Sequence, residues 1–193
     1  MKAQPEGFDP RLSAERQRDL PIQRMGKSSV KQPETYFMGT WDQRNVLNMP
    51  GPFYGAETDT CMDGPEYAPA SLLCDAIGQG FVWRQPRNDV ETLALMTGAS
   101  SDPFGGFGWD GDQHWTPDLV RDWWARRDER AHMVSSLVTE LTNPRLAASS
   151  LWISLVASYG DYIVFGLEEG LGRYLSFLET GRYPREGETL PAL

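Results

Sequence analysis

The sequence predicts an α+β fold: a small antiparallel sheet, built on a hairpin at about residues 70–86, is covered by four or five helices, and the C-terminal half is helical. Two observations lead to this prediction. Two short runs of β-prone residues flank a glycine-bearing turn between residues 70 and 86. From Asn88 onward, apolar residues recur at three- and four-residue spacing between helix-capping residues. A chain of 193 residues, 40% of them hydrophobic, is long enough to bury one substantial core.

The first 35 residues differ in composition from the rest of the chain. They carry seven basic residues against five acidic ones, several prolines and few large apolar side chains. We expect such a segment to be a flexible or loosely docked N-terminal arm, followed by a single globular domain over residues 36–193. A short helical turn at residues 12–19, with Ser13 as its cap, is the alternative for part of the arm.

Residues 36–69 form an irregular segment, in which prolines and glycines exclude a long helix or a central strand. Its aromatic residues indicate that the segment is ordered, and it has room for one further strand. The hairpin follows, with "ASLLCDA" and "FVWRQP" joined by "IGQG". Phe81 and Trp83 share one face of its second strand, and Pro86 ends that strand.

The helices are predicted from their caps and their apolar periodicity. Asn88 and Thr116 are N-cap residues, and Pro117 occupies the first helical position after Thr116. Gly166 and Gly170 lie four residues apart in the last helix, which indicates that another helix or an aromatic ring packs closely against them. The expected helices end at Gly98, near Asn143, at Gly160 and, for a helix that begins at Asp161, at Gly181.

Charge and composition exclude several classes of function. The net charge is −9, and residues 36–193 carry eleven basic residues, all arginine, against 22 acidic ones. This balance repels phosphate backbones, so we expect no nucleic-acid partner, and the mixed charges of "RDWWARRDER" indicate helical ion pairs instead. No apolar run approaches the length of a membrane span, and the start of the chain lacks a signal-peptide pattern, so we expect a cytoplasmic protein without a membrane partner. Two cysteines make no disulfide framework.

The stretch "FGGFGWDGDQHWTPDLVRDWW", residues 104–124, is the first candidate site because it concentrates tryptophans, carboxylates and a histidine. Asp110, Asp112 and His114 have the ligand types of a divalent metal site, but position 12 of a calcium-type loop is Arg121 where a glutamate is required. The structural interpretation is favoured: the two carboxylates accept loop amides, and His114 packs between Trp109 and Trp115. We therefore expect no metal and no cofactor.

A catalytic role for His114 is the other possibility to consider. His114 with Cys61 would be a conceivable base and nucleophile, but one histidine and one cysteine meet this pattern by chance too often to specify a catalytic residue.

The second candidate segment is "GAETDTCMDGPE", residues 55–66, in which Glu57, Asp59 and Asp63 are grouped. One interpretation is a negative rim for a basic partner, with the preceding Phe53 and Tyr54 as apolar anchors. The other is a solvated loop whose side chains cap local turns. The sequence supports both equally.

Four stretches together resemble a known group of proteins: "NVLNMPGPFYGAETDTC", "GFVWRQP", "DPFGGFGWDGDQHWTPDLVRDWW" and, near the end, "YLSFLETGRYP". They are similar to a family of small acidic bacterial proteins that is frequent in actinomycetes and is sometimes labelled ferredoxin; the DGDxHWTP core is the most specific part. The resemblance carries no activity over to this chain. The ferredoxin label is not supported, since an iron–sulfur cluster needs about four cysteine ligands and the chain has two.

We therefore expect a non-enzymatic, cytoplasmic protein-binding protein, most concretely an immunity protein that neutralises a bacterial toxin or effector domain with a basic surface. Aromatic residues would anchor the partner, and carboxylates would pair with its basic residues. The alternative is an enzyme, or a small-ligand or metal-binding protein, that uses the Asp110–Asp112–His114 loop; a third possibility is a structural subunit of a larger assembly. The expected contact residues are Phe53, Tyr54, Glu57, Asp59, Asp63, Trp109, Asp110, Asp112, His114 and Trp115.

Overall fold

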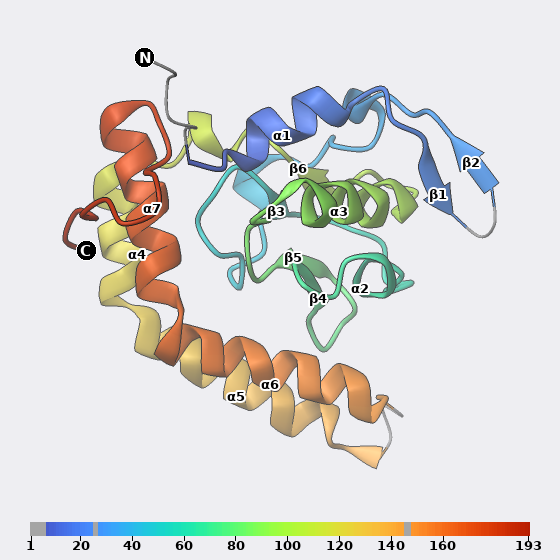
Figure 1. Cartoon of the computed structure of the whole chain (residues 1–193). Coiled ribbons are helices and arrows are strands. Elements are labelled where there is room, and N and C mark those ends of the chain that lie inside the picture. Colours follow the sequence, from blue (N-terminus) through green and yellow to red (C-terminus); the bar gives the residue numbers. More distant parts are fainter. Residues whose placement is uncertain (1–6, 25–26, 145–147) are drawn as a thin grey trace.

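The computed structural model describes residues 7–24, 27–144 and 148–193, and it has the predicted α+β architecture with a helical C-terminal half (Figure 1). The described strands form three two-stranded antiparallel pairs, β1–β2, β3–β6 and β4–β5. The strands are β1 (Ile22–Arg24), β2 (Lys27–Ser29), β3 (Tyr54–Gly55), β4 (Leu72–Cys74), β5 (Gly80–Val82) and β6 (Phe107–Gly108). The helices are α1 (Pro10–Gln17), α2 (Gly64–Tyr67), α3 (Asp89–Ser101), α4 (Pro117–Ala125), α5 (Arg127–Leu141), α6 (Ser150–Phe165) and α7 (Leu167–Thr180).

Helix α1 lies within the segment that the sequence indicated as an arm, and it packs beside α3 (Figure 1). The Asp9 side chain caps it by accepting a hydrogen bond from the Leu12 amide. Ser13 and Ala14 are fully buried, and the Ser13 hydroxyl donates to Asp89 at the start of α3, at 2.6 Å. This part of the first 35 residues is therefore folded onto the domain, while residues 1–6 and 25–26 lie outside the described residues.

The predicted hairpin is confirmed as β4–β5, with Leu73 opposite Phe81. Successive side chains along a strand point to opposite faces, and both faces of this hairpin are covered by apolar residues. Phe81 and Trp83 share a face, as expected, and pack with the C-terminal helices, whereas Leu72 and Val82 belong to a second apolar cluster with α3 and the N-terminal region. The hairpin thus separates two cores.

The C-terminal helices form two antiparallel pairs: α5 and α6 run side by side along one edge of the molecule, and α4 lies against α7 (Figure 1). The prediction that one helix ends at Gly160 and the next begins at Asp161 is wrong. Helix α6 continues through Gly160, and the chain bends by 68° at Gly166 before α7. Tyr162 explains the glycine spacing, because a Cβ on Gly166 or Gly170 would lie 2.7 Å or 2.4 Å from its side chain.

The prediction that Gly98 ends a helix is also wrong, because α3 continues to Ser101. A Cβ at position 98 would lie 2.7 Å from the Leu72 side chain and 3.0 Å from the Gly64 carbonyl oxygen. This glycine therefore permits close packing inside the helix. The predicted caps are both present: Asn88 accepts from the Glu91 amide, and Thr116 accepts from the Leu119 amide.

Among the described residues, no single helix has both the length and the apolar character needed to span a membrane. Helices α6 and α7 meet both criteria only when taken together, as the bent pair described above.

Candidate functional site

The two candidate segments lie side by side, because β3 pairs with β6: Tyr54 is opposite Gly108, and Gly55 is opposite Phe107. The Gly111 amide extends this contact by donating to the Pro52 carbonyl at 3.0 Å. Residues 110–115 therefore begin beside Pro52, at the end of the pair where the chain enters β3 and leaves β6.

Two polar side chains hold the segment before β3 in place. The buried Asn48 amide donates to the Gly55 carbonyl and accepts from the Gly55 and Val82 amides. Gln85 donates to the Phe53 carbonyl at 2.8 Å and accepts from the Phe53 amide at 3.3 Å. These bonds replace the ladder that a regular strand would supply, and they explain why an irregular, proline-rich segment is ordered.

Phe53 and Tyr54 are 0% and 1% exposed, so the interpretation of these residues as surface anchors has to be corrected. Phe53 packs in the cluster around α3, with its ring 5.7 Å from that of Phe37. Tyr54 directs its hydroxyl to the Gly39 carbonyl and to Asp110. In an irregular segment, an aromatic core residue cannot be distinguished from an aromatic contact residue by sequence, since no periodicity marks the buried side.

Asp110 and His114 form the polar part of the site. Asp110 Oδ1 accepts from the Tyr54 hydroxyl at 2.7 Å, and Asp110 Oδ2 lies 3.1 Å from His114 Nε2. Burial raises the pKa of Asp110, but the hydrogen bonds from Tyr54 and His114 outweigh this effect, and the net pKa lies below the ordinary value. The His114 ring stacks on Trp41, with centroids 4.8 Å apart and planes 10° apart.

Asp112 is directed to a different part of the molecule. Its Oδ1 atom accepts from the Tyr174 hydroxyl of α7 at 2.8 Å, and burial raises its pKa to about 6. Asp110 and His114 thus act together, whereas Asp112 joins its loop to α7. Within the described ranges, no group of three or more His, Cys, Asp or Glu side chains could hold a metal ion.

The aromatic residues of the site are half-buried and stacked. Trp41, from a 3₁₀ turn at Trp41–Gln43, meets Trp115 edge-to-face at 5.1 Å, and the Arg44 guanidinium lies 4.0 Å from the Trp41 ring centroid. Trp109 is held between Phe37, at 5.4 Å, and the Arg11 guanidinium, at 3.4 Å. His114 therefore packs on Trp41, and not between Trp109 and Trp115 as expected.

A groove of about 220 Å³ adjoins Trp115 and is lined by residues of the 44–48 segment and of α4. Val46 and Leu119 supply exposed apolar surface to it, at 55% and 43% exposure. Asp122 and Arg126 form an ion pair on its wall. We call this region the Trp41–Trp115 surface; it consists of Trp41, Arg44, Val46, His114, Trp115 and Leu119, with the polar groups around them.

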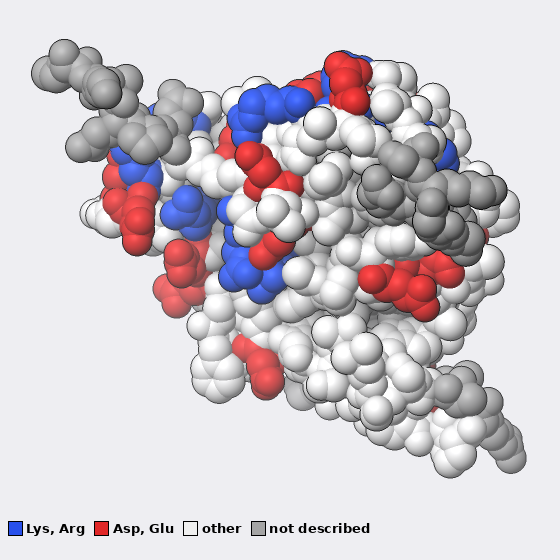
Figure 2. Space-filling view, turned by 45° about the vertical axis from the view of Figure 1, so that its right-hand side comes forward, with Lys and Arg blue, Asp and Glu red and all other residues white. Residues whose placement is uncertain are grey.

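Glu57, Asp59 and Asp63 lie toward the other end of the β3–β6 pair. The Asp59 amide donates to Asp102 at 3.2 Å, and the next residues lead into α2. Because the strands run antiparallel, residues that follow β3 lie beside residues that precede β6, away from Asp110. Figure 2 shows acidic and basic side chains interspersed over the upper part of one face of the molecule, so that part carries no uniform acidic field.

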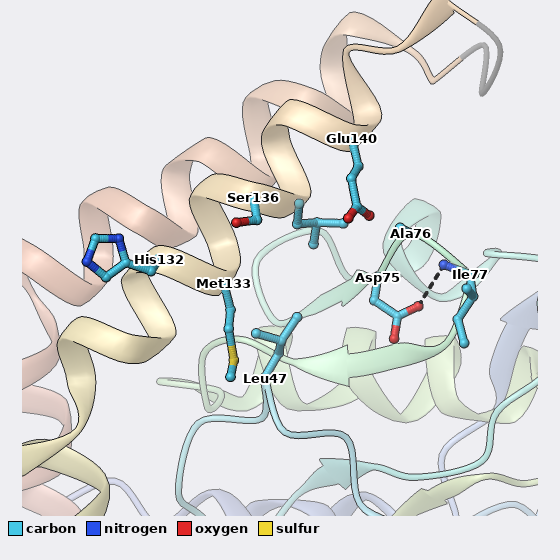
Figure 3. Close-up of a pocket in the computed structure, with 9 residues that line it drawn as sticks. Leu47, Asp75, Ala76, Ile77, His132, Met133, Ser136 and Glu140 are labelled. Carbon is cyan, nitrogen blue, oxygen red and sulfur yellow. Dashed lines mark hydrogen bonds between the residues drawn. The ribbon is translucent and has the colours of Figure 1, made fainter.

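A second open cleft, of about 440 Å³, lies between α5 and the β4–β5 turn (Figure 3). His132, Ser136 and Glu140 line it from α5, opposite Asp75. Figure 3 shows His132 at the far end of the cleft from Asp75. Asp75 also accepts hydrogen bonds from the Ile77 and Gln79 amides and from Asn45, so it serves to fix the turn. The cleft holds no assembled nucleophile and base.

Sequence reasoning missed Trp41 and Arg44. The available signal was the short "TWDQR" stretch, in which a tryptophan and an arginine three residues apart can stack within one turn. Comparison with known proteins gives no further guidance, because no family model, curated protein or solved structure matches the chain.

Proposed function

We propose that this protein binds another protein through the Trp41–Trp115 surface and acts as an immunity-type protein, by covering the functional surface of a toxin or effector domain. Half-buried tryptophans with a stacked arginine, beside a groove with exposed apolar walls, support this proposal. Tryptophan and arginine are the residues that most often dominate binding energy at protein interfaces.

The partner is expected to present basic residues. The chain carries a net charge of −9, which favours association with a positively charged protein. At this surface, hydrogen bonds stabilise the charged form of Asp110, and its side chain is about 39% exposed. Asp110 can therefore accept a hydrogen bond from a lysine or arginine of the partner. The apolar anchors in this revised site are Trp41 and Trp115, with Val46 and Leu119 beside them.

The test combines growth rescue with direct binding. The product of the gene adjacent to the one for this chain is expressed alone and together with the chain in a bacterial host. We expect growth arrest from the neighbour alone and rescue by the wild-type chain, together with a purified complex of the two proteins. W41A and W115A should weaken that complex by about ten-fold or more each.

Trp124→Ala is the matched control. Trp124 is also half-buried, and the Arg127 guanidinium lies 4.3 Å from its ring centroid, but Trp124 does not line the groove. Circular dichroism establishes that each variant is folded. The proposal is wrong if no neighbouring product is toxic or bound, or if Trp124→Ala weakens the complex as much as W41A and W115A do.

A further inference from the structure

We infer that a separate cleft, between α7 and the segment after β5, binds the carboxylate or phosphate group of a small organic anion. The cleft measures about 480 Å³, which is within the range of ligand sites. Arg84 and Arg87 line it from one side, and Arg173 of α7 lines it from the other. This inference does not depend on the proposed protein-binding function, because none of these residues belongs to the Trp41–Trp115 surface.

The convergence of three arginines is unusual for this chain. Residues 36–193 carry twice as many acidic as basic residues, yet Glu169 is the only acidic residue among the described residues that line the cleft. Glu91 does not line the cleft, but its Oε1 atom forms ion pairs with Arg87 Nη2, at 3.0 Å, and with Arg84 Nη2, at 3.6 Å. Among the described residues, three guanidinium groups at the cleft are thus accompanied by two carboxylates, and one positive charge is left for a ligand to neutralise.

Arg84 has unused hydrogen-bonding capacity. Its side chain is 16% exposed, its Nε atom is buried without a hydrogen-bond partner among the described residues, and its contact with Glu91 is long. Burial, together with the neighbouring Arg87, lowers its pKa. A buried cation with unmade hydrogen bonds is costly, and an oxyanion that accepts two parallel N–H bonds from a guanidinium relieves this cost.

The remaining walls fit the rest of such a ligand. Tyr162 lies beside Arg84 and Arg87, and its ring rests on the Gly166 and Gly170 backbone at the α6–α7 bend. Its hydroxyl can donate to an anion held by the arginines. Met49, Pro50 and Pro86 supply buried apolar surface for an organic body attached to the anionic group.

The test is a calorimetric titration of the full chain with phenyl phosphate and with benzoate, which separate the two sources of an oxyanion, and with benzyl alcohol as the uncharged comparison. We expect one or both anions to bind with a dissociation constant below about 1 mM, with affinity that falls as salt is added, and benzyl alcohol not to bind.

Arg84→Gln and Arg173→Gln should each weaken binding by about ten-fold. Tyr162→Phe, which keeps the ring against the glycines and removes only the hydroxyl, should weaken it by several-fold. Arg121→Gln is the matched control, since Arg121 pairs with Glu179 at 2.6 Å outside the cleft. If Arg84→Gln fails to fold, Arg173→Gln and Tyr162→Phe decide the question. Binding of neither anion, or binding that these variants leave unchanged, overturns the inference.

Discussion

The buried carboxyl of Asp112 should make the protein less stable at neutral pH than at mildly acidic pH. Burial raises its pKa from 3.8 to about 6. Between these two values the folded protein holds a proton that the unfolded chain has released, so the free energy of unfolding falls as the pH rises through this window. The shift of about two units corresponds to roughly 3 kcal/mol above pH 6.

Asp112→Asn isolates this effect, because an asparagine carbonyl can still accept from the Tyr174 hydroxyl and has no proton to lose. The stability difference between variant and parent should be small near pH 4 and grow to about 3 kcal/mol, in favour of the variant, above about pH 6.5. Carboxyls with lowered pKa values, such as Asp110, act in the opposite direction but equally in both proteins, so they cancel in the difference.

Urea unfolding followed by tryptophan fluorescence, at about pH 4, 5.5 and 7.5, measures this difference. Tyr174→Phe provides the converse case. It removes the hydrogen bond that lowers the Asp112 pKa, so the pH window should move upward and stability at neutral pH should fall. An Asp112→Asn protein that is no more stable than its parent at the highest pH, or a gain of the same size at every pH, would refute the reasoning.

Three further predictions concern packing, capping and exposure. Gly160→Ala should stabilise the protein by about 0.5–1 kcal/mol, because the new Cβ would contact Val134 at an ordinary 3.7 Å. Gly98→Ala should destabilise the protein, because its Cβ would overlap the Leu72 side chain. Thermal unfolding of both variants measures the two changes in stability, and changes of the same sign would contradict the packing argument. Thr116→Ala should cost about 1 kcal/mol through loss of the α4 cap, measured by urea unfolding against the exposed Thr139→Ala, which caps no helix. Cys61 is exposed and should react with a thiol reagent in the native protein. Cys74 is buried, and burial raises its pKa to about 12, so it should react only after unfolding. Rapid modification of both cysteines in the folded protein would contradict this prediction and would show that the β4 region opens readily.

Part of the candidate site was predictable. The stretch at residues 104–124 was marked by its composition, and the structure leaves Trp109, His114 and Trp115 partly exposed there, next to Tyr54 across the β3–β6 pair. The polar partners were not predictable, because Tyr54 reaches Asp110 across 56 residues and Tyr174 reaches Asp112 across 62. Contacts at such separations leave no periodic signal in one sequence, so the two aspartates could not be assigned to different roles.

The sequence alone determined what depends on neighbouring residues: the hairpin with its glycine turn, the capped starts of α3 and α4, and the helical C-terminal half. These features arise from backbone preferences and side-chain hydrogen bonds within a few residues. Tertiary packing alone decided which rings are buried, why α6 continues through Gly160 and stops at Gly166, and how arginines 84, 87 and 173 come to line one cleft. The physical reason is that burial and charge proximity depend on segments distant in the chain, which meet only when the cores on both sides of the hairpin form.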